Sequence, residues 1–363
     1  MENHFLVIIM ERADMDNHLL QKAYLETSGI LNEVAKKRKS TQFFQKVMWA
    51  ITGLYFLAML FVLVAYYFPS LGYSFFEGYP SLQLYLFGGL VIILYPTTFI
   101  FGSNFQKFKL KEAEAITKMV KLLFPKVEFS QNVQAPKKEI IKSKLFAWVT
   151  TDASMYSYGQ IRSSINGTVV NIADVGIVES KISNKITGTL MHIPVLNMVV
   201  VLSEYVLKNI FSNQSADNVY YTFRGMFCWL SFKKALNGHT VILTNNQSTK
   251  INRYFSSNFK AEEKINLEDP RFNNQFIVYS TDQVEARYVL SIALMERIVA
   301  LKEKFNQPII LSFQNKEMFL AVENENGIFS FPSGDLSTKK IVEELANDIE
   351  TALEIGSELK LND

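Results

Sequence analysis

Two long uncharged stretches stand out in the hydrophobic pattern of the N-terminal third of this sequence. Val47 to Phe68 covers 22 residues and Leu82 to Phe101 covers 20 residues, and neither contains a charged side chain. A helix needs about 20 apolar residues to cross the roughly 30 Å hydrocarbon core of a bilayer. The pattern therefore predicts a transmembrane helical hairpin over residues 47–101, with spans 47–68 and 82–101 and loop 69–81. A pair of buried core helices is the alternative interpretation.

Basic residues lie before the first predicted span and after the second, but not in the loop between them. Lys36–Lys39 precede the first span and Lys107, Lys109 and Lys111 follow the second, whereas loop 69–81 has no lysine or arginine. Positively charged flanks stay in the cytoplasm during insertion. We therefore expect the loop outside, both termini in the cytoplasm, and a multi-pass protein of the cytoplasmic membrane.

The segments on either side of the hairpin have helical periodicity and, in the second case, a basic character. Residues 1–46 are predicted as a cytoplasmic amphipathic helical segment, and residues 102–144 as a basic juxtamembrane connector. Lys107 to Lys144 contains ten lysines against four glutamates. Lys36–Lys39 and Lys107–Lys144 would favour anionic lipids by about 1 kcal/mol per nearby base. A solvated face that contacts no lipid is the alternative.

From residue 145 onward the pattern changes to short runs rich in β-branched and aromatic residues, which is typical of strands. Few helices separate these runs, so residues 145–363 are predicted as a cytoplasmic α+β domain with a mainly antiparallel β-sheet and packed helices. The predicted strands are 168–179, 218–224, 226–232, 240–244, 275–280, 308–313 and 318–322. Asn315 is expected to turn the last two into a hairpin.

Capping signals mark the helices of this domain. Asp282 and Glu285 have capping-box spacing, and Ser291 is placed to cap a helix over 292–305. Residues 337–355 repeat an amphipathic pattern that predicts a packed helix. The apolar segment 190–211 fits either an amphipathic helix on the membrane face or part of the core.

Composition and charge exclude several classes of function. The formal charge of +2 gives no general affinity for nucleic acid. Cys228 is the single cysteine, so an internal disulfide and a cysteine-built zinc site are excluded. His4, His18, His192 and His239 have no ligand spacing among them, and no nucleotide-binding motif occurs. We therefore predict neither metal nor cofactor.

One polar cluster deserves a chemical interpretation, because several acids and an arginine fall close together. Its members are Glu268, Asp269, Asp282, Glu285, Arg287 and Glu296. Paired carboxylates with an arginine suit acid–base chemistry. The structural alternative is that Asp282 and Glu285 cap a helix, Asp269 turns the chain before Pro270, and Arg287 pairs with an acid. Separately, Gly225 is expected to serve a bulge or a close approach in a strand.

The sequence also resembles a bacterial inner-membrane protein family of unknown function. The blocks that carry the resemblance are 223–227, 267–272, 276–280, Asp282, 285–288, 295–297 and 311–313, including the run D-P-x-F…V-Y-S-x-D-x-x-E-A-R-Y. The resemblance implies two N-terminal transmembrane helices and a cytoplasmic α+β domain, but no activity. It also implies, by analogy alone, a LemA-like membrane protein as a partner.

Two function classes follow from these patterns. The first is a membrane-anchored, non-catalytic binding or scaffold protein of the cytoplasmic membrane. The second is an enzyme acting at the inner membrane surface through Asp282, Glu285 and Arg287. An enzyme requires these side chains to converge in a cleft, whereas capping residues point at their own backbone.

Overall fold

The computed structural model separates into two units, one helical and one built on a β-sheet. The helical unit holds the described residues of 29–112, and the sheet unit holds those of 17–28, 113–178 and 221–358. The structure describes residues 17–67, 82–131, 133–149, 153–165, 168–178, 221–245, 249–259, 263–324, 327–331, 336 and 338–358. The predicted segment 190–211 lies outside these residues.

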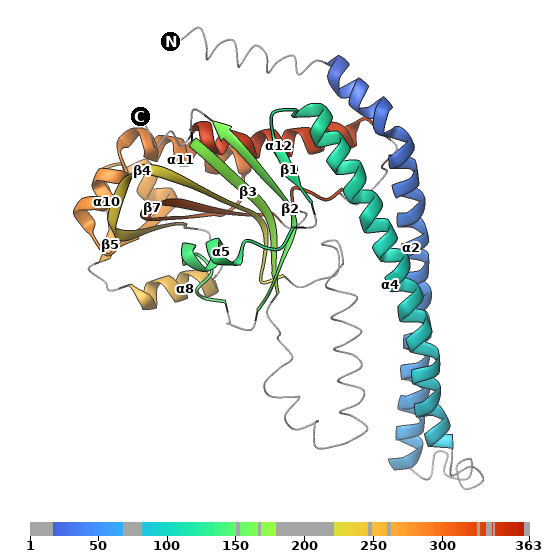
Figure 1. Ribbon diagram of the computed structural model, residues 1–363. Helices are drawn as coiled ribbons and strands as arrows, with labels where there is room; N and C mark the ends of the chain where they lie inside the picture. Colours follow the sequence, from blue (N-terminus) through green and yellow to red (C-terminus); the bar gives the residue numbers. More distant parts are fainter. Residues whose placement is uncertain are drawn as a thin grey trace. The chain divides into compact units, whose positions relative to one another are not determined.

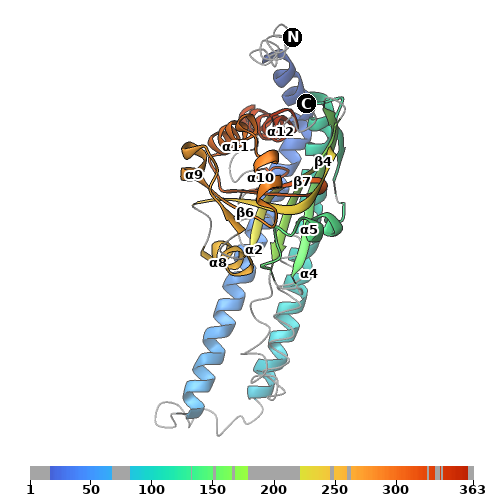
Figure 2. The same ribbon diagram turned by 90° about the vertical axis from the view of Figure 1, so that its left-hand side faces the viewer.

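The helical unit is formed by parts of two long helices, α2 (Asn17–Tyr67) and α4 (Leu82–Leu123). The helices run side by side in both views (Figure 1, Figure 2). Their buried side chains recur at intervals of three, four or seven residues, as in a coiled-coil seam. These residues are Leu31, Val34, Thr41 and Met48 on α2, and Phe101, Phe105, Phe108 and Glu112 on α4.

Charged pairs align the two helices of this unit. Arg38 lies 3.6 Å from the buried carboxylate of Glu112, and Lys111 lies 3.4 Å from Glu33. The guanidinium of Arg38 also stands over the ring of Phe108, 5.6 Å from its centroid. A buried charge requires a partner, so the Arg38–Glu112 pair favours one register of α2 against α4.

The two predicted spans fall within these helices, since α2 ends at Tyr67 and α4 begins at Leu82. Within the described residues, no helix has a stretch that is both long and apolar enough for a membrane crossing. The predicted transmembrane hairpin over 47–101 is therefore not supported by the structure.

The sheet unit contains a seven-stranded sheet in which every neighbouring pair is antiparallel. The order is β1-β2-β3-β4-β6-β5, and β7 pairs with β4. The strands are β1 (Glu128–Ser130), β2 (Ser154–Ile165), β3 (Thr168–Val178), β4 (Phe223–Thr244), β5 (Lys264–Ile265), β6 (Phe276–Ser280) and β7 (Ile309–Glu323). The predicted antiparallel α+β fold is confirmed.

Helices cover both faces of this sheet (Figure 1). They are α5 (Lys137–Ser143), α8 (Thr249–Asn258), α9 (Pro270–Gln275), α10 (Gln283–Val289), α11 (Ile292–Phe305) and α12 (Lys340–Glu358). On one face, the α5 segment and α8 pack Phe146 and Phe255 against Phe227 and Phe319 of the sheet. On the opposite face lie α11 and α12, with Ile298 and Ile349 fully buried. The predicted helices at 292–305 and 337–355 are confirmed.

The predicted hairpin at Asn315 is wrong, because the chain continues through it as one strand. Residues 309–323 form β7, which pairs along most of β4 from Gly225↔Glu323 to Leu243↔Ile310. Asn315 has φ 56° and stands opposite Leu236, where the register of the pair shifts. Between Ser231↔Glu317 and His239↔Gln314 the extra residues lie on β4, so β4 bulges opposite Asn315 while β7 continues. The separate strands predicted at 226–232 and 240–244 are likewise one strand, β4, which begins at Phe223, while residues 218–220 lie outside the described residues.

Gly225 meets the expectation of a close approach between backbones. Its φ is +153°, and a Cβ atom placed there would lie 2.1 Å from the carbonyl oxygen of Val322. The carbonyl oxygen of Arg224, the residue before Gly225, accepts a hydrogen bond from the Asn324 N–H at 2.9 Å. Glycine therefore lets β4 and the end of β7 close together beside Arg224.

Candidate functional site

The most densely bonded polar group of the sheet unit is a buried ion pair between neighbouring strands β3 and β4. Asp174 is fully buried and Arg224 is 4% exposed. The guanidinium donates to both carboxylate oxygens, through Nη1 to Oδ1 and through Nη2 to Oδ2, and it also donates to the carbonyl of Val175 at 3.2 Å. Two-point contact between arginine and a carboxylate is a strong and directional form of ion pair.

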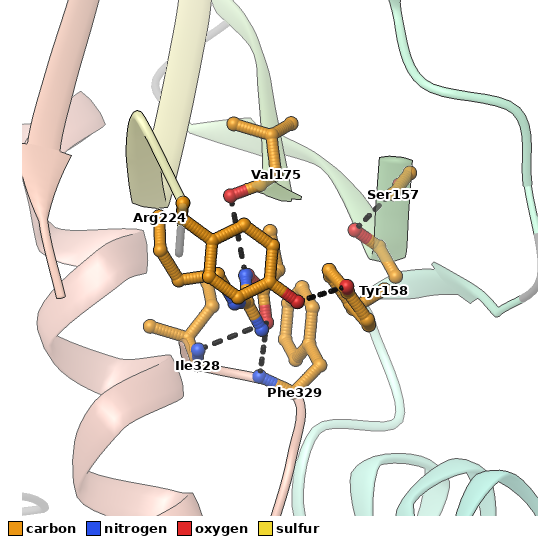
Figure 3. Close-up of polar contacts among 9 residues, drawn as sticks. Ser157, Tyr158, Val175, Arg224, Ile328 and Phe329 are labelled. Atoms are coloured by element: carbon orange, nitrogen blue, oxygen red, sulfur yellow. Dashed lines mark hydrogen bonds and ion pairs between the residues drawn. The ribbon is translucent and has the colours of Figure 1, made fainter. Parts of the chain in front are cut away.

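Two tyrosines contact this pair, and Figure 3 labels one of them, Tyr158, beside Arg224. The Arg224 guanidinium lies 4.0 Å from the ring centroid of Tyr158, and the hydroxyls of Tyr158 and Tyr221 are 2.5 Å apart. Burial raises the pKa of both tyrosines, so both remain neutral hydroxyls at physiological pH. Gly176 makes room for them, because a Cβ atom there would lie 2.6 Å from the ring of Tyr221.

The same carboxylate fixes the segment that follows β7. Oδ2 of Asp174 accepts the backbone N–H groups of Ile328 at 3.0 Å and Phe329 at 2.9 Å. Gly327 reaches this position with φ +71°, and a Cβ atom there would lie 2.0 Å from Nη2 of Arg224. Figure 3 marks hydrogen bonds that run from the backbone nitrogens of Ile328 and Phe329. Asp174 therefore joins β3, β4 and the segment 327–331.

This arrangement is suited to holding the fold together rather than to binding a substrate. The guanidinium is occupied by a carboxylate, a carbonyl and an aromatic face. The carboxylate is occupied by the guanidinium and two backbone donors. Both charges are buried among groups of the protein itself, so the pair stabilises its neighbours and offers little accessible surface to a ligand.

The side chains of the predicted cluster at 282–287 bind backbone groups and each other's neighbours, and Asp282 caps a helix as expected. Asp282 is the N-cap of α10, and its Oδ1 accepts the N–H groups of Val284 and Glu285, each at 3.0 Å. The Glu285 carboxylate accepts the N–H groups of Asn237 at 3.0 Å and Gly238 at 2.6 Å. Glu285 therefore binds the β4 backbone instead of completing a capping box.

The other members of the predicted cluster have separate structural roles. Asp269 caps α9 by accepting the N–H groups of Arg271 and Phe272 at 2.8 and 3.3 Å. Arg287 donates to the carbonyl and side-chain oxygens of Gln283, so its expected pairing with an acid is wrong. Glu268 and Glu296 are both exposed. The structural interpretation of the cluster is the one that its geometry supports.

Two of the four histidines, His18 and His239, lie among the described residues. His239 contacts a polar side chain. Its Nε2 lies 3.0 Å from the Ser312 hydroxyl, and its ring is 5.9 Å from that of Phe259. Burial, with a smaller contribution from the charge of Lys144, lowers the pKa of His239 to about 4. Ser312 is itself fully buried within β7, so this serine–histidine contact lacks the access that a nucleophile needs.

The described residues contain no group of three or more histidine, cysteine, aspartate or glutamate side chains that could hold a metal ion. Cys228 is fully buried in β4, and burial raises the pKa of its thiol to about 12. A thiol with such a pKa is unreactive at neutral pH. The predictions for His4 and His192 fall outside the described residues.

Part of this chain matches a known protein family. Residues 221–361 match a family described as "Protein of unknown function (DUF3137)". The resemblance to a family of unknown function is thus confirmed for these residues, while the N-terminal helices lie outside the match. No curated protein matches the chain. A solved structure, the mycobacterial trehalose monomycolate transport factor A, TtfA, is similar with a TM-score of 0.36 and 9% identity, over 69% of this chain and 96% of that chain.

The sequence contains a pattern from which the Asp174–Arg224 pair could have been predicted. Asp174 is the single acid within the apolar strand pattern of 168–178, and Arg224 is the single base of the run 218–224. One acid and one base, each isolated in a buried strand, need each other because neither can be buried alone. Strand pairing, which sequence alone did not supply, is what brings them together.

Replacing Arg224 by methionine tests the importance of the buried pair. We expect Arg224→Met to lower the free energy of unfolding by about 3–5 kcal/mol, because Asp174 would keep a buried charge without its cation. Arg271→Met is the matched control, since the Arg271–Glu303 pair is exposed and is worth about 1 kcal/mol or less. Urea unfolding of the full chain in mild detergent measures both, and equal losses would contradict the assigned role.

The depressed pKa of His239 predicts sensitivity to acid. The unfolded chain protonates this side chain near pH 6.5 and the folded chain only near pH 4, so stability falls as the pH drops between these values. The loss is at most about 1.4 kcal/mol for each pH unit. We expect His239→Gln to flatten this part of the profile, and the exposed control His18→Gln to leave it unchanged.

Thermal unfolding as a function of pH measures the effect. Asp348 contributes an opposite slope, because burial and Glu344 raise its pKa from 3.8 to about 6. This contribution is common to the wild type and both variants, so the difference between profiles isolates His239. Parallel profiles for wild type and His239→Gln would show that His239 is not the responsible group.

Proposed function

We propose that this chain is a membrane-anchored, non-catalytic binding or scaffold protein of the cytoplasmic membrane. The observation that supports this proposal is the large apolar surface exposed by the helical unit. On α2, Leu54 is 75% and Leu57 is 63% exposed, and on α4, Ile92 is 73% and Phe99 is 71% exposed. Large apolar side chains gathered on neighbouring helices favour lipid or a protein partner over water.

The charge pattern supports the same proposal and supplies an orientation. Lysines occupy the part of each helix beyond the uncharged runs, at Lys36–Lys39 on α2 and at Lys107, Lys109 and Lys111 on α4. The positive-inside rule then directs loop 69–81 outward and leaves the sheet unit in the cytoplasm. In this arrangement the apolar ends of α2 and α4 anchor the protein, and the basic parts face the anionic inner leaflet.

The contacts made by the polar side chains favour a non-catalytic role. Asp282 and Glu285 bind backbone N–H groups, and Arg287 binds Gln283, so these three do not converge on a common point. Asp174 and Arg224 bind each other in a buried ion pair. The enzyme alternative at 282–287 therefore lacks the geometry that acid–base chemistry requires, and a LemA-like partner remains a hypothesis by analogy.

Cysteine labelling tests the proposed anchoring and orientation. Cys228 can remain in place, because a buried thiol with a pKa of about 12 does not react. We expect a membrane-impermeant maleimide to label Ser74→Cys in intact cells, and to label Ser256→Cys in α8 only after permeabilisation. Labelling of both sites only after permeabilisation, with release of the protein from membranes by high salt, would overturn the anchor.

An affinity pull-down separates scaffold from enzyme. Full-length tagged protein in mild detergent is compared with Asp282→Ala/Glu285→Ala/Arg287→Ala. The charge-matched control is Glu268→Ala/Arg271→Ala/Glu296→Ala, in which all three side chains are exposed. We expect both variants to retain the stoichiometric partner of the wild type, since Asp282 caps α10, Glu285 binds the β4 backbone and Arg287 binds Gln283. A small molecule bound by the wild type and the control, but lost from the first variant, would instead favour an enzyme.

A further inference from the structure

A lysine-lined groove lies between α2 and α4 within the helical unit. It has a volume of about 380 Å³ and is lined by Lys36, Lys37, Ser40, Glu33, Asn104 and Lys107. Residues of both helices contribute, so the groove exists only while the helices are paired. Three lysines against one glutamate make its lining cationic, and Glu33 is also contacted by Lys111 at 3.4 Å.

We propose that this groove binds the phosphate of an anionic phospholipid headgroup, an inference that rests on the membrane anchoring proposed above. Lysine is a compact, strongly hydrated charge that binds phosphate oxygens without requiring a planar partner. The Ser40 hydroxyl and the Asn104 amide add neutral donors beside the three ammonium groups. Phosphate oxygens accept several hydrogen bonds at once, which this mixture of donors can supply.

The position of the groove along the helices favours a lipid over a free anion. Lys107 is six residues beyond Phe101, where the second uncharged run ends, and Ser40 is seven residues before Val47, where the first begins. At 1.5 Å per residue these separations are about 9 and 10 Å. Headgroups and their interfacial region extend roughly 5–8 Å beyond the hydrocarbon on each side of a bilayer.

The direction of the Lys107 side chain narrows the remaining distance, whereas Lys36 and Lys37 on α2 tilt away from the uncharged run of that helix. Side chains on a helix tilt toward its N-terminus, and for Lys107 on α4 this is the direction of the uncharged run. A lysine can also extend its aliphatic stem along apolar surface and place its ammonium group in the headgroup layer. The groove therefore lies where a lipid phosphate would be found if the apolar ends of α2 and α4 enter the bilayer.

The test compares lipid binding by two triple variants of the full-length protein in neutral detergent. The groove variant removes the lining lysines, Lys36→Gln/Lys37→Gln/Lys107→Gln. The control variant removes three exposed lysines of the same two helices that do not line the groove, Lys39→Gln/Lys46→Gln/Lys121→Gln. Each protein is titrated with short-chain phosphatidylglycerol, short-chain phosphatidylcholine and glycerol phosphate, and binding is followed by phosphorus NMR.

We expect wild type and control to bind phosphatidylglycerol equally within about twofold, and the groove variant to bind it about tenfold or more weakly. Phosphatidylcholine should bind weakly to all three proteins, because its headgroup has no net charge. Equal losses in both variants would show diffuse attraction and overturn the groove as a site. Glycerol phosphate binding as tightly as phosphatidylglycerol would identify a soluble phosphate ligand and overturn the lipid assignment.

The failure of this inference and the failure of the proposed function are distinguishable. Cysteine labelling reports anchoring whether or not a phosphate occupies the groove, whereas the titration in detergent reports the groove without a bilayer. A protein that is anchored with the expected orientation, but whose groove variant binds like the wild type, retains the proposed function and loses the lipid site.

Discussion

The sheet unit depends on the pairing of two charges that could not be buried separately. Removing a carboxylate and a guanidinium from water costs several kcal/mol for each ion, and only good geometry with further hydrogen bonds offsets this cost. Asp174 and Arg224 meet that requirement with their mutual contacts, two backbone donors on the carboxylate and a carbonyl for the guanidinium. The pair therefore specifies how β3, β4 and the segment 327–331 come together.

Three glycines leave the space that the groups around this pair require. Gly176 leaves space for the two tyrosine rings that shield it, and Gly327 adopts a positive φ to bring the Ile328 and Phe329 N–H groups to Asp174. Gly225 follows Arg224 directly and permits the close approach of the β7 end. A side chain at any of these positions would push apart groups that the ion pair holds together, so the charges and the glycines form one interdependent arrangement.

The two units use their polar residues in different ways. In the sheet unit, the acids that the sequence offered as candidates for acid–base chemistry bind backbone N–H groups instead. They are Asp269, Asp282 and Glu285. In the helical unit, the partly buried Arg38 pairs with the buried Glu112 across α2 and α4, while lysines line a groove and apolar side chains are exposed. The surfaces available for interaction are thus concentrated on α2 and α4, which is why both proposals concern them.

The sequence by itself determined the local elements, because their signals are local. Runs rich in β-branched and aromatic residues predicted β3 and β6, caps at Asp282 and Ser291 predicted α10 and α11, and uncharged runs predicted helices that end near Tyr67 and begin at Leu82. Only the tertiary structure decided which strands pair. It showed that β7 runs through Asn315 opposite a bulge of β4, that Glu285 reaches Gly238, and that Asp174 lies against Arg224, 50 residues away. Such contacts depend on sheet register, and register arises from the packing of the whole core rather than from any short run of residues.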